Sequence, residues 1–168
     1  MASFIILMGV SGSGKTVVGK ALAPKLNAEF IDGDNLHSQH NVDKMAAGIP
    51  LTDEDRFDWL QLIAKVGHEH VGQGTNCIIA CSALKKAYRD ILRADNPSIK
   101  FIYLKGSYDL IFDRISKRSH QYMPSGLLQS QFDILEEPQK DEKDVFVVSI
   151  DQEISEIVEG IVKANLIS

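Results

Sequence analysis

The amino-acid sequence predicts an α/β fold: a five-stranded parallel sheet between two layers of helices, with a small helical lid. The first observation is a set of five short apolar runs, at residues 4–8, 28–32, 77–81, 100–104 and 145–150. They are rich in β-branched and aromatic residues and lack a polar alternation, which is typical of strands buried on both faces. The second observation is that helix-like segments separate these runs, and this alternation favours a parallel sheet with right-handed crossovers.

The segments between the predicted strands carry helix signals. Residues 15–26 place apolar side chains on one face, and Pro24 should kink or end that helix. Thr52 and Asp55 form a capping-box pattern before the next helix, whose acidic first turn suits the helix dipole. Further helices are expected within residues 82–97, 107–119 and 154–167.

The length of 168 residues predicts one domain over residues 1–168, and no internal repeat or low-complexity linker divides the chain. The stretch that follows Arg118 delays the last strand by more than a crossover needs. We therefore expect an inserted helical lid at approximately residues 114–138.

Composition and charge exclude several classes of protein. With 23 acidic and 18 basic residues the net charge is −5, which argues against non-specific binding to nucleic acid. Cys77 and Cys81 stand on one predicted strand about 13 Å apart, so we expect buried thiols in a reducing compartment rather than a disulfide. The sequence shows no signal peptide and no apolar run of membrane-spanning length, so we expect a cytoplasmic protein without a membrane partner.

The segment between the first strand and the first helix matches a phosphate-binding loop. It reads GVSGSGKT and fits the pattern G-x-x-x-x-G-K-[ST] at every fixed position. In this pattern backbone N–H groups and the helix N-terminus hold phosphates, the lysine reaches the β- and γ-phosphates, and the hydroxyl ligates Mg²⁺. The expected ATP-binding residues are therefore Gly9, Val10, Ser11, Gly12, Ser13, Gly14, Lys15 and Thr16, the last also as the metal ligand.

Two other nucleotide-binding classes fit the chain poorly. A dinucleotide fingerprint that starts at Gly12 would need glycine at Val17. A GTPase is disfavoured, because no Asp is followed three residues later by Gly and no Asn is followed by Lys. The loop therefore predicts ATP together with Mg²⁺.

Polar side chains follow the second and third strands, at the sheet edge where ligands of such folds bind. The second strand is followed by Asp32, Asp34 and His37, and the third by Ser82, Lys85, Lys86 and Arg89. We expect Asp34 to accept a proton from an attacking hydroxyl or to hold a water on Mg²⁺. The alternatives are an ordinary Asp-Gly turn for Asp32 and Asp34 and a surface position for His37.

Cations beside this edge are candidates for an anionic acceptor. Arg56 stands in a first helical turn, where the dipole disfavours it, so it should serve an anionic ligand or a buried carboxylate. A salt bridge to Asp53 or Asp58 is the alternative. Among Lys85, Lys86 and Arg89, we expect one or two side chains to point into the site.

The predicted lid begins with a pair of arginines. Arg114 and Arg118 lie four residues apart, so both fall on one helix face. A cationic pair at the root of a lid suits closure over the transferring phosphates with exclusion of water. A solvated arginine pair is the alternative.

Together these residues resemble the gluconokinase family, within the P-loop kinases of small metabolites. The matching stretches lie between residues 7 and 151 and are LMGVSGSGKT, DGDNLH, KMAAGIPLTDEDRFDWL, CSALKKAYRDILR, FIYLKG, LLQSQFDILEEP and VVSID. CSALKKAYRD and the pattern from Lys44 to Trp59 are specific to that family rather than to phosphate loops in general. The lid departs from the family's KR-x-x-HF, because His120 stands one place early and Gln121 takes its position, so His120 receives no role.

The resemblance implies ATP-dependent phosphorylation of D-gluconate at its 6-hydroxyl, which gives 6-phosphogluconate for the pentose phosphate pathway, commonly by a homodimer. By the same resemblance Asp34 contacts the reacting hydroxyl, Arg118 lies on the phosphates, and the candidates for the polyol and its carboxylate are His37, Arg56, Lys85 and Arg89. With the residues indicated by the loop, the strand ends and the arginine pair, the expected catalytic residues are Asp34, Lys15 and Arg118, and Arg114 and Arg118 are expected on the phosphates of ATP. The residues expected to bind the acceptor are Asp34, His37, Lys44, Arg56, Ser82, Lys85 and Arg89.

Two other functions stay open: a kinase of another small metabolite, such as shikimate or a nucleoside monophosphate, and a nucleotide-binding module without transfer. The segment between the second and third strands is acidic, which suits a polyol with one carboxylate better than a dianionic phosphate. Asp34 together with Arg114 and Arg118 favours an enzyme, because a sensor needs neither an acceptor-side carboxylate nor a lid.

Overall fold

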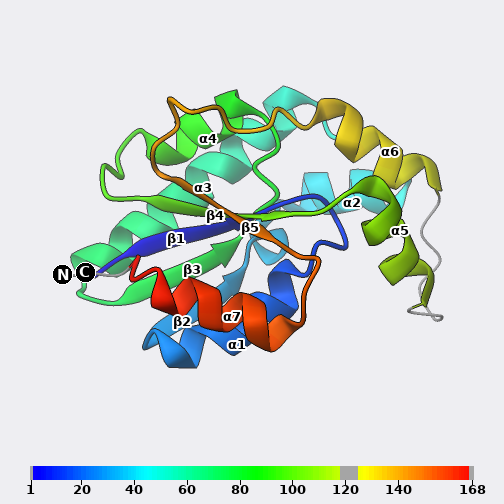
Figure 1. Cartoon of the computed structure of the whole chain (residues 1–168). Helices are drawn as coiled ribbons and strands as arrows, with labels where there is room; N and C mark the ends of the chain where they lie inside the picture. The colour runs from blue at the N-terminus through cyan, green and yellow to red at the C-terminus, as the bar shows by residue number, and fades with distance from the viewer. Residues whose placement is uncertain (1, 118–124, 167–168) are drawn as a thin grey trace.

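A computed structural model describes residues 2–117 and 125–166 and contains the expected five-stranded parallel sheet (Figure 1). The strands stand in the order β2-β3-β1-β4-β5, so β1 lies at the centre. Their bounds agree with the predicted runs to within one residue at each end: β1 Phe4–Met8, β2 Ala28–Asp32, β3 Asn76–Ala80, β4 Lys100–Lys105 and β5 Val145–Ser149.

The central strand explains why the apolar runs show no polar alternation. Ile5 and Leu7 face one hydrophobic core, whereas Phe4 and Ile6 face a second core on the other side of the sheet. All of these side chains are buried. A strand with a core on each face needs apolar residues at every position.

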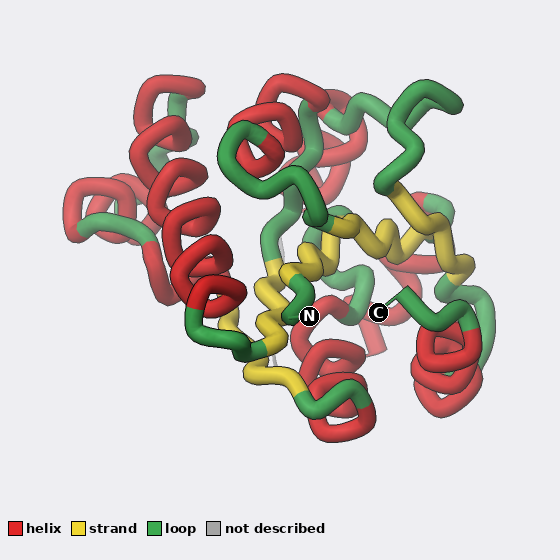
Figure 2. Tube along the Cα trace, turned by 90° about the vertical axis from the view of Figure 1, so that its left-hand side faces the viewer, coloured by secondary structure: helices red, strands yellow, loops and turns green. Residues whose placement is uncertain are grey.

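Helices cover both faces of the sheet (Figures 1 and 2). One face carries α1 (Lys15–Lys25) and α7 (Ile154–Lys163), and the other carries α3 (Asp53–Gly72) and α4 (Lys86–Arg93). The helices α5 (Tyr108–Lys117) and α6 (Ser125–Ile134) lie beyond the carboxyl ends of the strands, with the segment 118–124 between them outside the described residues. None of the helices in the described ranges is long and apolar enough to cross a membrane.

Two local predictions are confirmed. Thr52 Oγ1 accepts the N–H of Asp55 at 3.1 Å while Oδ2 of Asp55 accepts the N–H of Thr52 at 3.0 Å, which completes the capping box. Cys77 and Cys81 are free, buried thiols, and burial raises the pKa of each to about 12. Pro24 lies in the last turn of α1.

The structure adds two short helices between β2 and α3 that the sequence pattern did not reveal. They are the 3₁₀ helix η1 (Gly33–Leu36) and α2 (Gln39–Ala46). Ser38 caps α2, because its Oγ accepts the N–H of Asn41 at 3.2 Å. Lys44 then joins α2 to the first turn of α3 through an ion pair of 2.6 Å with Asp55.

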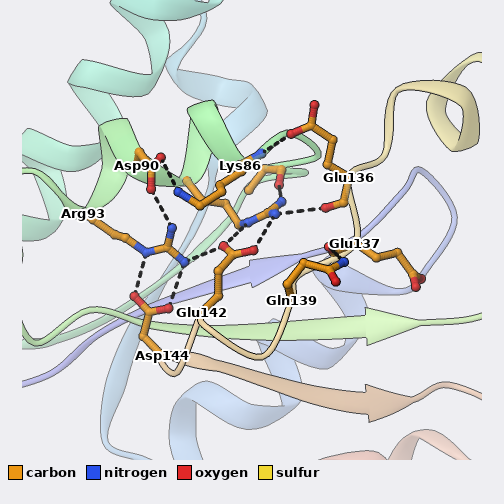
Figure 3. A network of polar contacts seen from close by, with 10 residues as sticks. Lys86, Asp90, Arg93, Glu136, Glu137, Gln139, Glu142 and Asp144 are labelled. Atoms are coloured by element: carbon orange, nitrogen blue, oxygen red, sulfur yellow. Dashed lines mark hydrogen bonds and ion pairs between the residues drawn. The ribbon is translucent and has the colours of Figure 1, made fainter.

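A buried arginine, Arg89 on α4, connects three segments. Its partners Glu136 and Glu142 are labelled in Figure 3. Arg89 is 0% exposed, and its guanidinium donates to both carboxylate oxygens of Glu142, at 2.8 and 3.0 Å. The same group donates to the carbonyls of Ala83 and Glu136, at 2.8 and 2.9 Å. The prediction that Arg89 binds substrate is therefore wrong: its guanidinium is enclosed, and it holds the β3–α4 loop to the chain that follows α6.

The network around Arg89 predicts a pH-dependent stability. Burial alone would raise the pKa of Glu142, but hydrogen bonds from Arg89 and Arg93 outweigh burial and lower the pKa from 4.5 to about 2. A carboxyl whose pKa falls on folding stabilises the fold above its unfolded value, and this contribution is lost as the pH falls from 4.5 to about 2. Glu142→Gln should lower the free energy of unfolding at pH 7 by about 3 kcal/mol, and it should flatten the loss of stability in that acidic window.

Urea unfolding followed by circular dichroism at neutral and acidic pH measures both effects. Glu159→Gln is the matched control, because Glu159 forms an exposed ion pair with Lys163 on α7. Its loss should change the free energy of unfolding by less than about 1 kcal/mol. Equal effects of the two substitutions at pH 7 would contradict the stabilising role of Glu142.

Candidate active site

The phosphate loop joins β1 to α1 and depends on its glycines. Gly12 and Gly14 have φ of 83° and 100°, in the left-handed region that favours glycine. A side chain at Gly9 would place its Cβ 2.7 Å from Ser13 Oγ, so this position also needs glycine for close approach. The loop therefore has the tight backbone that an anion-binding turn requires.

Backbone N–H groups of the loop are available to an anion. Within the described residues, the amides of Gly12 and Gly14 have no protein acceptor. The amides of Lys15 and Thr16 lie in the first turn of α1, where N–H groups have no acceptor within the helix. Ser13 Oγ is buried and is likewise without a hydrogen-bond partner in the described part of the chain. These donors lie at the N-terminus of α1, where the helix dipole adds positive potential.

Lys15 is folded back over the loop. Its ammonium donates to the carbonyls of Gly9 and Val10, at 2.9 and 3.0 Å. Burial lowers the pKa of Lys15, and the carboxylates of Asp34 and Asp32 oppose that effect. The lysine is thus a desolvated cation with two acidic groups nearby, which suits a charge that meets phosphate oxygens.

The two aspartates belong to the turn after β2. Asp32 caps η1, since its Oδ1 accepts the N–H of Asp34 at 3.0 Å. Gly33 does not adopt a left-handed φ; a Cβ there would lie 2.3 Å from the carbonyl oxygen of Ala80. Glycine is therefore required for close approach to β3 rather than for a sharp turn, and this approach brings Asp34 toward the phosphate loop.

His37 lies against the aromatic face of α3. Its ring stacks on Trp59 with 4.1 Å between centroids and an interplanar angle of 16°. Trp59 in turn donates its indole N–H to the carbonyl of Gly33 at 2.8 Å, and Nδ1 of His37 lies 3.2 Å from the side-chain amide of Asn41. Burial lowers the pKa of His37, with Asp34 opposing and Arg56 reinforcing the shift, so a neutral imidazole is favoured at pH 7.

Arg56 and Lys85 meet around Tyr88. Both cations lie over the Tyr88 ring, at 5.7 and 5.5 Å from its centroid. The Tyr88 hydroxyl accepts from Arg56 at 3.2 Å and donates to Asp53 at 2.6 Å, and Asp53 also forms an ion pair of 3.2 Å with Lys85. These hydrogen bonds from Tyr88 and Lys85 hold the pKa of Asp53 below its usual value. Two cations thus converge beside the Asp34 turn, with one carboxylate between them.

The remaining predicted site residues have other surroundings. Lys44 is held by Asp55, between α2 and α3, and Lys86 points outward to an ion pair with Asp90. The carbonyl of Ser82 accepts the N–H of Gly9 at 3.3 Å, which ties the β3–α4 loop to the phosphate loop. Arg114 donates to the carbonyl of Ile150, just after β5, at 2.6 Å. Arg118, His120 and Gln121 lie outside the described residues.

Sequence reasoning missed four residues that shape the site. Trp59 stacks on His37, and Tyr88 contacts Arg56 and Lys85. An isolated aromatic residue in a helix is usually interpreted as part of the hydrophobic core. Their signal was their place inside the stretches KMAAGIPLTDEDRFDWL and CSALKKAYRDILR. The other two are Asp53, which pairs with Lys85, and Gln131, whose Oε1 accepts the N–H of Ser11 at 2.6 Å.

A phosphate loop at the central strand, with an acidic turn and paired cations beyond the neighbouring strands, defines the class: the chain is a P-loop kinase. The sequence profile of the shikimate kinase family matches residues 11–164. The thermosensitive gluconokinase of Escherichia coli K12 is 47% identical over 154 residues, which cover 92% of this chain and 82% of that protein. The chain therefore belongs to the gluconokinase family.

Two further relatives support the same family. The thermoresistant gluconokinase of Escherichia coli K12 is 47% identical over 153 residues, covering 91% of this chain and 87% of the relative. The crystal structure of a gluconokinase from Sinorhizobium meliloti 1021 superposes with a TM-score of 0.88 at 41% identity, over 98% of this chain and 91% of that one. The similarity therefore extends over the sheet, both helical layers and the described part of the site.

Proposed function

We propose that the chain is an ATP-dependent gluconokinase, which transfers the terminal phosphoryl group of ATP to the 6-hydroxyl of D-gluconate. The observation that carries the proposal is the identity of 47% with a gluconokinase along 92% of the chain. The products are 6-phosphogluconate and ADP. A nucleoside monophosphate as the acceptor fits this family membership less well than gluconate does. A nucleotide-binding module without phosphoryl transfer also fits it less well.

The donor side of the site holds the triphosphate mainly through backbone groups. The free amides of Gly12, Gly14, Lys15 and Thr16 surround the phosphates, and the Lys15 ammonium exchanges its carbonyl partners for phosphate oxygens. Because the cradle is built mainly from backbone dipoles, Lys15 is the only cationic side chain within the loop itself. Arg114, with Arg118 from the segment outside the described residues, supplies the further cations on the phosphates.

The residues present fit a bound Mg²⁺ ion. Thr16 offers a hydroxyl at the start of α1, and Asp34 lies near enough to Lys15 to affect its pKa, so Thr16 would ligate the ion with Asp34 acting through a water. Among the described residues, no group of three or more acidic, histidine or cysteine side chains could hold a metal ion. When bound, Mg²⁺ neutralises the charge that develops on the transferred group.

On the acceptor side, Asp34 orients the attacking hydroxyl and accepts its proton. The neutral imidazole of His37 offers a hydrogen bond to the polyol, and its stack on Trp59 fixes the ring. Arg56 and Lys85, held together by Tyr88, bind the carboxylate of gluconate. We further propose a homodimer located in the cytoplasm; light scattering coupled to size-exclusion chromatography tests the former.

An ADP-release assay over a panel of acceptors tests the proposal. Gluconate should give turnover, whereas shikimate, AMP and other sugar acids should give little. A Lys15→Ala protein prepared in parallel controls for contaminating kinases, because it lacks the cation on the phosphates. Turnover with AMP or shikimate and none with gluconate would overturn the proposed substrate.

Asp34→Asn should separate nucleotide binding from transfer. The amide keeps the shape of the side chain but cannot take the proton, so turnover should fall by about 10²- to 10⁴-fold. The affinity for ATP, measured by calorimetry, should stay close to that of the unsubstituted protein. A collapse of ATP affinity would instead make Asp34 a direct metal ligand or a structural residue.

Lys85→Met should weaken the binding of gluconate without affecting the binding of ATP. Loss of a charge-assisted hydrogen bond predicts a rise of roughly tenfold in the KM for gluconate, with the KM for ATP unchanged. Lys86→Met is the matched control, because the neighbouring lysine points outward to Asp90 and should leave both constants unchanged. Equal effects of the two substitutions would show that Lys85 does not bind the acceptor.

A further inference from the structure

Helix α6 is seated on the core next to the phosphate loop. Leu128 is fully buried and belongs to the same hydrophobic cluster as Val10, in the loop, and Ile111, on α5. Phe132 packs edge-to-face on Tyr108 with 5.7 Å between ring centroids. Just after the helix, the N–H of Glu136 donates to the carbonyl of Leu84 at 2.7 Å. The helix is thus fixed at both its buried face and its C-terminal end.

From this helix, Gln131 contacts the phosphate loop directly. Its Oε1 accepts the backbone N–H of Ser11 at 2.6 Å, across 120 residues of sequence. The amides of Gly12, Gly14, Lys15 and Thr16, which have no protein acceptor in the described chain, follow Ser11 directly along the loop. The contact therefore occupies an amide at the border of the cradle and leaves the phosphate-binding amides themselves available.

Other hydrogen bonds hold the base of the loop. The N–H of Gly9 donates to Ser82, and the carbonyls of Gly9 and Val10 accept from Lys15. If Lys15 turns to phosphate oxygens when ATP binds, these two carbonyls lose that partner. The bond from Gln131 does not depend on Lys15, so it can hold the Ser11 segment while the lysine is engaged by the nucleotide.

We propose that Gln131 is a positioning residue for ATP: its carboxamide fixes the Ser11 segment so that the adjacent cradle amides are aligned before the phosphates arrive. The proposal rests on the phosphate loop binding ATP, as in the proposed function, and not on the identity of the acceptor. A glycine-rich segment without this bond would lose conformational freedom on binding, and that cost would appear as weaker affinity.

Gln131→Leu, which keeps the bulk of the side chain and removes the acceptor, should weaken ATP binding about three- to tenfold. The KM for ATP should rise by the same factor while the KM for the acceptor stays constant. Gln129→Leu is the matched control: Gln129 lies on the same helix, is exposed, and bonds only to Asp133 among the described residues, at 2.8 Å. It should leave the affinity unchanged.

Amide hydrogen exchange measured by NMR provides a readout that helix packing alone would not move. In the unsubstituted protein the Ser11 N–H should exchange more slowly than the Gly12 N–H. Gln131→Leu should abolish this difference, and Gln131→Glu, which retains an acceptor oxygen, should preserve it. The exchange comparison in the unsubstituted protein stands even if Gln131→Leu does not fold.

Three outcomes would overturn the proposal: an unprotected Ser11 amide, an unchanged ATP affinity in Gln131→Leu, or a tighter affinity, which would make Gln131 a competitor of the nucleotide. ATP binding and exchange are measured without an acceptor. If gluconate gives no turnover but Gln131→Leu weakens ATP binding and removes the protection of the Ser11 amide, the proposed acceptor is rejected. The positioning role of Gln131 then still holds.

Discussion

The site depends on one enclosed guanidinium. Arg89 makes hydrogen bonds to Ala83, Glu136 and Glu142, and so joins the loop after β3, the chain that follows α6 and the approach to β5. An ion buried to this degree is costly unless all its partners are in place, so the three segments are arranged together or not at all. Lys85, which we propose to bind the acceptor, and the helix that contacts the phosphate loop both adjoin these segments. The position of groups that never touch Arg89 is thus set by its partners.

The two halves of the site use different chemistry. The proposed donor side is a backbone cradle whose shape is imposed by Gly9, Gly12 and Gly14, and such a cradle binds phosphates without contacting the rest of the ligand. The proposed acceptor side is made from side chains on η1, α3 and α4, where Trp59 and Tyr88 act as platforms for His37 and for two cations. Selectivity for an acceptor therefore resides in side chains that could vary between kinases while the cradle stays constant. This division explains why the loop alone indicates the donor but not the acceptor.

The strands and the phosphate loop could be predicted because their signals are local: uninterrupted apolar runs, and fixed residue types at fixed spacing. Helix α2 could not, since the segment Gln39–Ala46 has only 8 residues, most of them polar, and is held by contacts such as Lys44 with Asp55. Arg89 was misassigned because its burial depends on Glu142, 53 residues away, and a cation after a strand gives no sign of that partner. The bond between Gln131 and Ser11 joins residues 120 apart and has no local signal at all. Local chemistry was readable, and long-range pairing was not.

The stack of His37 on Trp59 has a practical consequence. Trp59 is the single tryptophan of the chain, so indole fluorescence excited selectively has one origin in this protein. That origin lies beside the turn that carries Asp34, with the ring in contact with one residue of the acceptor side and bonded to the carbonyl of Gly33. Any ligand that displaces His37 or shifts the turn changes the environment of the fluorophore. The molecule therefore carries an intrinsic optical probe at the place where the acceptor is expected to bind, with no label to be introduced.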